Sequence, residues 1–249
     1  MGAKTALLAY ADGDVASALR KAGEPAAEGT AALIARVFPG RAAEPTPADV
    51  LGDSTYPPEH LTYAASFPGV DLVCDRRLMF DRPSELPAHL LEAAAGRRVI
   101  LHAMHSVSDW LAFAVWESGR LVRSLSLSPD GGIAENIGAP FPFEAPYWAG
   151  DRGVASEPEW DEEPYPLPFH PLELGDEALR ALFGFLLEGR PSPGDVDPQE
   201  VPLLGFHLTE PDPSRRGRER AALEEAARRM QRRTLRLGGD GEWSEAADG

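Results

Sequence analysis

The stretch RRVILHAMHSVSDWLAFAVWESGRLVRSLSLS, residues 97–128, decides the fold. It contains three apolar runs separated by two short polar pieces, SVSD at 106–109 and ESG at 117–119. Apolar runs of this length between turn residues predict strands, and strands joined by such short connections pair antiparallel. The middle run, DWLAFAVW, is apolar on both of its faces, so we expect it to be covered on both sides. The stretch therefore predicts a three-stranded antiparallel meander.

Strand-like and helix-like patterns alternate on either side of this stretch. Short apolar runs predict further strands, whereas apolar residues at helical spacing between capping residues predict helices. Frequent Pro, Gly and Asp predict a loop over residues 41–60, and eight prolines predict a long extended surface loop over residues 139–171. The expected strands cover 4–11, 69–80 and 133–138, and the expected helices cover 14–23, 30–38, 83–96 and 175–190.

These patterns predict an α+β protein, in which a mixed sheet has the antiparallel meander at its centre and helices pack on it. We expect a single α+β domain over residues 1–210 and a charged helical tail, partly disordered, over residues 211–249. Within that tail, residues 214–236 hold nine Arg against three Glu, although the whole chain carries a net charge of −16. The tail helix is a candidate surface for a protein partner or for self-association.

The composition narrows the classes of function. A strongly acidic chain repels a phosphate backbone, so nucleic acid is an unlikely partner. No apolar run approaches the length of a membrane span, so we expect no membrane partner. The single cysteine, Cys74, excludes an internal disulfide, which fits a reducing compartment. We therefore expect a soluble, cytoplasmic protein.

The corner between the first two runs holds the densest group of polar candidates, His102, His105 and Asp109 with two serines. On a strand, two histidines three residues apart point to opposite faces, so they do not easily share one metal ion. A triad of Ser106 or Ser108 with either histidine and Asp109 is conceivable, because triads are defined by geometry. No G-x-S-x-G motif supports it. We favour a polar corner in which Asp109 and the serines bond local backbone, beside a possible pocket.

Asp12 and Asp14 follow the first expected strand and precede a helix. Two carboxylates there could hold Mg²⁺, with one acting as a phosphoryl-accepting nucleophile, as in the D-x-D start of the haloacid-dehalogenase phosphatases. The later Lys and Asp-Asp pair of that pattern are missing. Helix capping by Asp14 explains the same residues and is the interpretation that we favour.

Asp75, Arg76 and Arg77 lie near the end of another expected strand. A pair of arginines beside a strand end can bind a carboxylate or a phosphate in bidentate fashion. A phosphatase loop of the C-x5-R type is excluded, because Phe80 stands where that motif needs its arginine. Structural ion pairs, with Asp71 or Asp81, are the commoner role.

Four stretches of the chain are distinctive when they are taken together and in order. They are MGAKTALLAYADGD, SFPGVDLVCDRRLMFDRPSELP, ILHAMHSVSDWLAFAVWESGRLVRSLSLSPDGGIAENIG and PLPFHPLELGDEALRALFGFLLEG. Together they closely resemble a family of uncharacterised proteins, carried as a domain of unknown function, from high-GC Gram-positive bacteria. The resemblance spans roughly residues 1–210. It implies one family-wide unit and a cytoplasmic bacterial setting, and it transfers no activity, cofactor or catalytic residue.

Two main hypotheses about function remain, beside a third and weaker one in which the basic tail over 214–236 is a nucleic-acid arm. The first is a non-catalytic binding or regulatory protein without a cofactor, because no motif combines the geometry and the chemistry of an active site. The alternative is a Mg²⁺-dependent hydrolase of phosphate esters, with Asp12 and Asp14 as ligand and nucleophile and Arg76 on the phosphate. The two hypotheses differ in whether Asp12, Asp14, Arg76 and the corner at 102–109 converge on one pocket.

Overall fold

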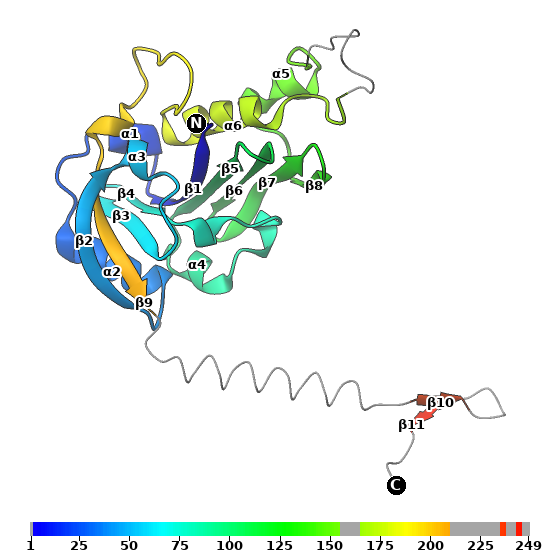
Figure 1. Ribbon diagram of the computed structural model, residues 1–249, viewed down its shortest axis with the longest axis horizontal. Helices are drawn as coiled ribbons and strands as arrows, with labels where there is room; N and C mark the ends of the chain where they lie inside the picture. Colours follow the sequence, from blue (N-terminus) through cyan, green and yellow to red (C-terminus); the bar gives the residue numbers. More distant parts are fainter. Residues whose placement is uncertain (1, 155–164, 210–234, 238–242, 246–249) are drawn as a thin grey trace. The chain divides into compact units, whose positions relative to one another are not determined.

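The structure is a computed structural model, and it describes residues 2–154, 165–209, 235–237 and 243–245 (Figure 1). Its internal contacts divide the chain into two units, residues 1–209 and 210–249. In the second unit, β10 (Leu235–Leu237) pairs antiparallel with β11 (Trp243–Glu245). The tail helix expected over 214–236 falls outside the described residues, apart from its last two residues, which belong to β10.

The first unit is built on one nine-stranded sheet, in the order β2-β9-β3-β4-β1-β5-β6-β7-β8. Each pair of neighbouring strands runs antiparallel, so the prediction of a mixed sheet is wrong. Parallel neighbours need a long crossover, usually a helix, whereas the short turns that join β3 to β4 and link β5, β6, β7 and β8 can connect only antiparallel neighbours. The strands are β1 (Lys4–Ala11), β2 (Ala42–Val50), β3 (Leu61–Phe67), β4 (Val70–Cys74), β5 (Arg98–His105), β6 (Trp110–Glu117), β7 (Arg120–Ser128), β8 (Gly132–Ile137) and β9 (Pro202–Thr209).

The stretch at 97–128 forms β5, β6 and β7, which pair in chain order and continue into β8. These strands form one end of the sheet, and the middle strand is β1 instead. β1 occupies the centre because it pairs with β4 on one side and β5 on the other, and seven of its eight residues are buried. The six inner residues of β6 are buried as well, which confirms that this strand is covered on both sides.

The other end of the sheet was not predicted. Residues 41–60, expected to be a loop, contain β2 and the short helix α3 (Leu51–Ser54), and β2 pairs with β9. Proline is tolerated in an edge strand because one side of such a strand needs no ladder hydrogen bonds, and Pro45 and Pro47 lie in this one. The exposed side chains of β2 also remove the apolar alternation that would have identified it.

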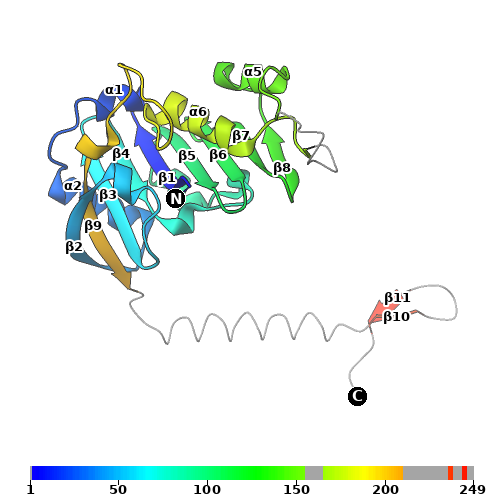
Figure 2. The same cartoon turned by 45° about the horizontal axis from the view of Figure 1, so that its top comes forward.

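Helices cover both faces of the sheet (Figures 1 and 2). One apolar cluster joins one face to α1 (Val15–Leu19), α5 (Ala145–Trp148) and α6 (Pro171–Phe183). The second cluster joins the opposite face to α2 (Ala27–Val37), α4 (Ala88–Glu92) and the 3₁₀ turn η1 (Arg76–Leu78). The remaining 3₁₀ turns are η2 (Pro83–Glu85), η3 (Pro142–Glu144) and η4 (Pro198–Glu200).

α6 begins and ends earlier than its apolar pattern predicted. Its N-cap is His170, and Pro171 occupies the first turn, whereas the helix had been expected to begin at residue 175. The helix ends at Gly184, which adopts a left-handed conformation with φ of 86°. A Cβ atom at that glycine would lie 2.3 Å from the Cβ of Ala16, so the close approach of α1 also requires glycine here.

The proline-rich segment is more ordered than an extended loop where it is described. Residues 142–148 form η3 and α5, in which proline occupies the first turn and therefore breaks no hydrogen bond. Glu144, fully buried, forms an ion pair with the equally buried Arg123 of β7 at 2.6 Å. Residues 155–164 of the segment lie outside the described residues.

Candidate ligand-binding site

The candidate residues fall at opposite ends of the central strand. Asp12 and Asp14 follow the last residue of β1, whereas Lys4 at its first residue pairs with His105. Arg76 follows β4, whose register with β1 places it at the same end as His105. At about 3.4 Å per residue, the eight residues of β1 separate the two groups by roughly 24 Å. The structure therefore does not bring together the residues that the hydrolase alternative requires.

The Asp12–Asp14 end has the geometry of a helix start. The Oδ1 atom of Asp14 accepts a hydrogen bond from the backbone N–H of Ser17 at 2.8 Å, which caps α1. Hydrogen bonding to the side chain of Ser17, and then to its backbone, lowers the pKa of Asp14. Both aspartates are exposed. Among the described residues no group of three His, Cys, Asp or Glu side chains is placed to hold a metal ion. The pair does not fit a magnesium site, because one carboxylate is used for capping and, in the part of the chain that the structure describes, the surrounding acidic side chains form no group placed to hold an ion.

His102 and His105 lie on opposite faces of β5, as their spacing predicted. The buried His102 lies between Thr5, whose Oγ1 is 2.8 Å from its Nδ1, and the carbonyl of Gly175, 2.9 Å from its Nε2. A carbonyl only accepts, so Nε2 carries the proton and Nδ1 accepts from the threonine hydroxyl. Burial lowers the pKa of His102 to about 4, so the ring is neutral at pH 7. His102 therefore connects β1 and β5 to α6, and no solvent reaches it.

The corner at 106–109 does not assemble a catalytic triad. The hydroxyl of Ser108 donates to the backbone carbonyl of His105 at 3.4 Å, and its N–H bonds the same carbonyl. Asp109 adopts a left-handed conformation with φ of 45°, and its Oδ2 lies 3.7 Å from Nε2 of His170. The serine thus bonds local backbone, as expected of a polar corner, whereas the aspartate contacts a more distant residue.

Asp75 and Arg77 form a rigid ion pair. The guanidinium of Arg77 donates from Nε and Nη2 to the two oxygens of the buried Asp75, at 2.8 and 2.5 Å. Thr62 also bonds Asp75, and Nη2 of Arg77 donates to Thr62 Oγ1 at 3.0 Å. The plane of the guanidinium lies over the ring of Phe38, 4.6 Å from its centroid. Arg76, the next residue back, points elsewhere and lies over the ring of Tyr56 at 4.3 Å.

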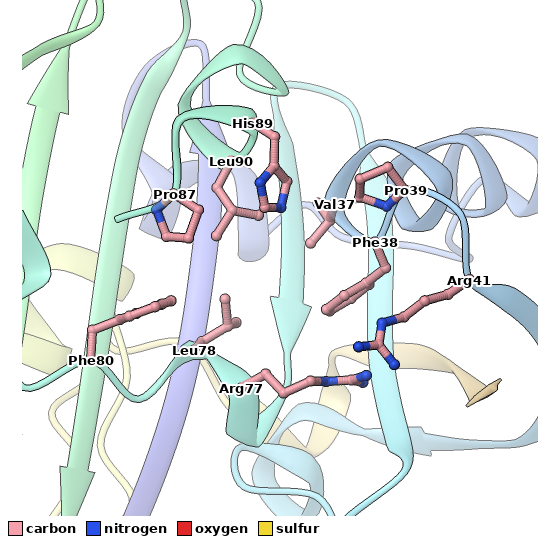
Figure 3. Close-up of a pocket in the computed structure, with 10 residues that line it drawn as sticks. All are labelled: Val37, Phe38, Pro39, Arg41, Arg77, Leu78, Phe80, Pro87, His89 and Leu90. Atoms are coloured by element: carbon pink, nitrogen blue, oxygen red, sulfur yellow. The ribbon is translucent and has the colours of Figure 1, made fainter. Parts of the chain in front are cut away.

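The ion pair stands at the wall of a hollow of about 400 Å³, which we call the Arg77 pocket (Figure 3). Three segments build it, the end of α2, the chain around η1, and the start of α4, and their side chains point into one shared space. The pocket is lined by Val37, Phe38, Pro39, Arg41, Arg77, Leu78, Phe80, Pro87, His89 and Leu90.

The lining of the Arg77 pocket combines apolar walls with basic side chains. Seven of its ten residues are apolar, and the other three are Arg41, Arg77 and His89. No acidic residue lines it, although the chain holds 40 Asp and Glu against 24 Lys and Arg. Asp75 neutralises the charge of Arg77, so Arg77 supplies a fixed hydrogen-bond donor at the wall of the pocket.

Sequence reasoning identified only Arg77 of this pocket. The apolar members resemble ordinary core residues in the sequence, and they meet only because α2, η1 and α4 pack on the same face of the sheet. One signal was available, because the run RRLMF places two arginines directly before apolar and aromatic residues near a strand end. It could not have shown which of the two arginines faces α2.

Comparison with known proteins identifies a family but no activity. No curated protein and no solved structure matches the sequence. No helix within the described ranges is both long and apolar enough to cross a membrane. The sequence matches a protein family over residues 5–206, which includes every strand of the large sheet except the first residue of β1 and the last three residues of β9. The chain therefore belongs to the family of unknown function DUF6928.

Proposed function

We propose that this protein is a non-catalytic binding module, and that the Arg77 pocket holds a small organic anion with an apolar body. Ligand sites are typically concave and mostly apolar, with a few polar groups that fix orientation. The Arg77 pocket has this composition, and its volume of about 400 Å³ lies in the usual range for a small ligand. The proposal makes the binding hypothesis specific to one site and one class of ligand.

The observation that carries the proposal is the sign of the charged groups. In a chain of net charge −16, a pocket whose ionisable lining residues are all basic departs from the surrounding surface. Basic groups beside low-dielectric walls concentrate an anionic ligand. The ring of Phe38 and the side chains of Phe80 and Leu90 would contact its apolar part. Binding without chemistry is supported by the lining itself, which has no hydroxyl, thiol or carboxylate beside its single imidazole.

The test compares two ligands of nearly equal shape, 1-naphthoate and the neutral 1-naphthamide, by isothermal titration against the full chain. We expect the carboxylate to bind about tenfold more tightly, a difference of about 1.4 kcal/mol. Raising the ionic strength should reduce that difference, because salt screens partly exposed charges. Equal affinity for the two compounds, or no saturable binding of either, contradicts the proposal.

A variant that adds a negative charge at the pocket tests whether the binding occurs there. His89 is exposed at the rim, so His89→Glu should leave the fold intact and abolish the preference for naphthoate. The matched control is Arg120→Glu, an exposed position at the start of β7 that does not line the pocket. If both variants lower the affinity for naphthoate equally, the anion responds to overall charge and not to the Arg77 pocket.

A further inference from the structure

A second hollow lies at the corner that the sequence singled out, on the other side of residues 75–81. It has a volume of about 480 Å³, and we call it the corner pocket. Residues of the same short segment alternate between the two hollows, because Arg77, Leu78 and Phe80 line the Arg77 pocket whereas Met79 and Asp81 line this one. The corner pocket is lined by Tyr56, Met79, Asp81, His105, Ser108, Trp110, Ser128 and Asp130.

A row of side chains across neighbouring strands includes His105, Trp110 and Ser128 of the corner pocket and continues beyond it to Lys4, which does not line the pocket. Lys4 of β1 pairs with His105 of β5, and His105 pairs with Trp110 of β6. Residues paired directly across antiparallel strands project to the same face. Leu111 of β6 pairs with Leu127 of β7, and the two strands are antiparallel. Trp110 therefore lies opposite Ser128, the last residue of β7, which extends the row by one strand. With strands about 4.8 Å apart, the row from Lys4 to Ser128 spans roughly 14 Å.

One end of this row is basic. Tyr56 is the shared contact there, with the Arg76 guanidinium 4.3 Å and the Lys4 Nζ atom 5.8 Å from its ring centroid. The ring of His105 meets the same tyrosine edge-on at 5.7 Å. Burial, and then Lys4 and Arg76, lower the pKa of His105, so this imidazole adds a hydrogen-bonding group without a charge at pH 7. Neither cation forms an ion pair with another described residue.

The other end of the row is acidic. Asp130 lies two residues after the end of β7 and lines the corner pocket. Asp81 lies in the segment between η1 and η2. Because η1 contacts β1 whereas η2 contacts β6 and β7, this segment crosses the sheet toward the end of the row where Asp130 lies. Both carboxylates are exposed, and within the described ranges neither is assigned a hydrogen bond or an ion pair. The indole of Trp110 lies between the acidic and the basic groups along the row, as a surface on which an ammonium group can rest.

We propose that the corner pocket binds a zwitterion of the short-peptide class. Its ammonium group lies beside Asp81 and Asp130 against Trp110, and its carboxylate extends past Tyr56 to Lys4 and Arg76, which adjoin the pocket at that residue. A ligand with one charge would satisfy only one end of the row. In an extended tripeptide the two terminal charges are about 10 Å apart. The first and last strands of the row are roughly 14 Å apart between their backbones, and the charged side chains at the two ends shorten the distance that the ligand must span. This inference is independent of the Arg77 pocket, since the two pockets share no lining residue.

The test uses trialanine with two chemically blocked forms, N-acetyl-trialanine and trialanine amide, titrated into the full chain. Binding is followed by calorimetry and by tryptophan fluorescence, with Trp110→Phe as the variant that removes the local signal. We expect trialanine to bind with saturation, and each blocked form at least about tenfold more weakly. Equal binding of the amide or of the acetylated form shows that one end of the row is not used, and it overturns the zwitterion assignment.

Matched variants separate the two ends of the corner pocket. Asp130→Asn should weaken trialanine severalfold and leave the acetylated peptide unaffected, because that peptide has no ammonium group. Arg76→Gln should weaken trialanine and leave the amide unaffected, because the amide has no carboxylate. Asp151→Asn, an exposed position outside the pocket, is the control and should change nothing. Absence of saturable binding of trialanine at about 10 mM overturns the proposal.

Discussion

At the scale of single residues, the sequence predicted the roles of some polar side chains and not of others. Asp14 was predicted as a helix cap and is one, because capping depends on a few neighbouring residues. The opposite faces of His102 and His105 also follow from strand periodicity alone. The sequence could not show which of Arg76 and Arg77 pairs with Asp75. The answer depends on the positions of Phe38 and Tyr56, each of which packs against one of the two guanidinium groups. Local rules thus held, and choices that depend on tertiary neighbours did not.

We predict that His102 makes the stability of the protein depend on pH. Its pKa in the folded state is about 4, below the ordinary value of 6.5. Between these values the unfolded chain takes up a proton that the folded chain does not, so the free energy of unfolding falls as the pH decreases from 6.5 to 4. The loss over this window is on the order of 3 kcal/mol. The variant His102→Gln has no imidazole at this position, so its free energy of unfolding should not show this decrease.

The measurement is urea unfolding of both proteins at pH 7.5 and at pH 5. The variant should be clearly less stable at pH 7.5, because it disturbs a buried pair of hydrogen bonds, and the gap should narrow at pH 5. Burial raises the pKa of Asp176 to about 6, which acts in the opposite direction, but Asp176 is present in both proteins and cancels. A gap that is equal at the two pH values contradicts the prediction.

We predict that Asp14 stabilises the protein as a helix cap, with or without a metal ion. Replacing it in Asp14→Ala removes the acceptor for the N–H of Ser17 and should cost about 1 kcal/mol. Thermal unfolding with and without millimolar Mg²⁺ checks this, because a metal that bound the folded state would raise the melting temperature of the wild type. We expect Asp14→Ala to lower the melting temperature equally under both conditions. A Mg²⁺-dependent rise that the variant loses would support the hydrolase alternative.

At the scale of elements, the buried strands were predicted better than the edges. β1 was predicted with its observed bounds, because a strand buried on both faces is a continuous apolar run. β2 and β9 lie at the far end of the sheet, where prolines and exposed side chains remove that pattern. α6 was predicted too far along the chain, because its apolar stripe continues past Gly184 into packed residues such as Phe185, which is buried outside the helix.

The link between β7 and the η3–α5 segment gives a prediction at this scale. Glu144 accepts from Nε and Nη2 of Arg123, from the backbone of Phe141 and from the indole of Trp148. Glu144→Ala should cost about 3–5 kcal/mol, because it leaves a fully buried guanidinium unpaired. Urea unfolding measures this cost. The double variant Arg123→Met with Glu144→Leu should recover much of the loss, and failure to recover any would show that the pair also provides specificity.

At the scale of the whole molecule, the chain divides at Thr209. All nine strands of the large sheet, both apolar clusters and both proposed pockets lie before this residue. The family match ends within the same unit, at residue 206. The described part of the second unit contains only the pair β10 and β11, and a two-stranded sheet contributes little stability alone. We therefore expect the first unit to fold independently of the second.

We predict that a chain ending at Thr209 folds as the full chain does. No strand of the large sheet loses a partner, and no residue that lines either pocket is removed, so the cooperative unfolding of this unit should keep its midpoint and its urea dependence. Urea unfolding, monitored by tryptophan fluorescence, measures the midpoint and the urea dependence. The shorter chain keeps four of the five tryptophans and lacks only Trp243. The shorter chain should also retain the affinities for naphthoate and trialanine, if the full chain shows them. A lower unfolding midpoint with an unchanged urea dependence would mean that residues 210–249 stabilise the first unit. Loss of naphthoate or trialanine binding without a change in the midpoint would mean that the second unit contributes to a ligand site.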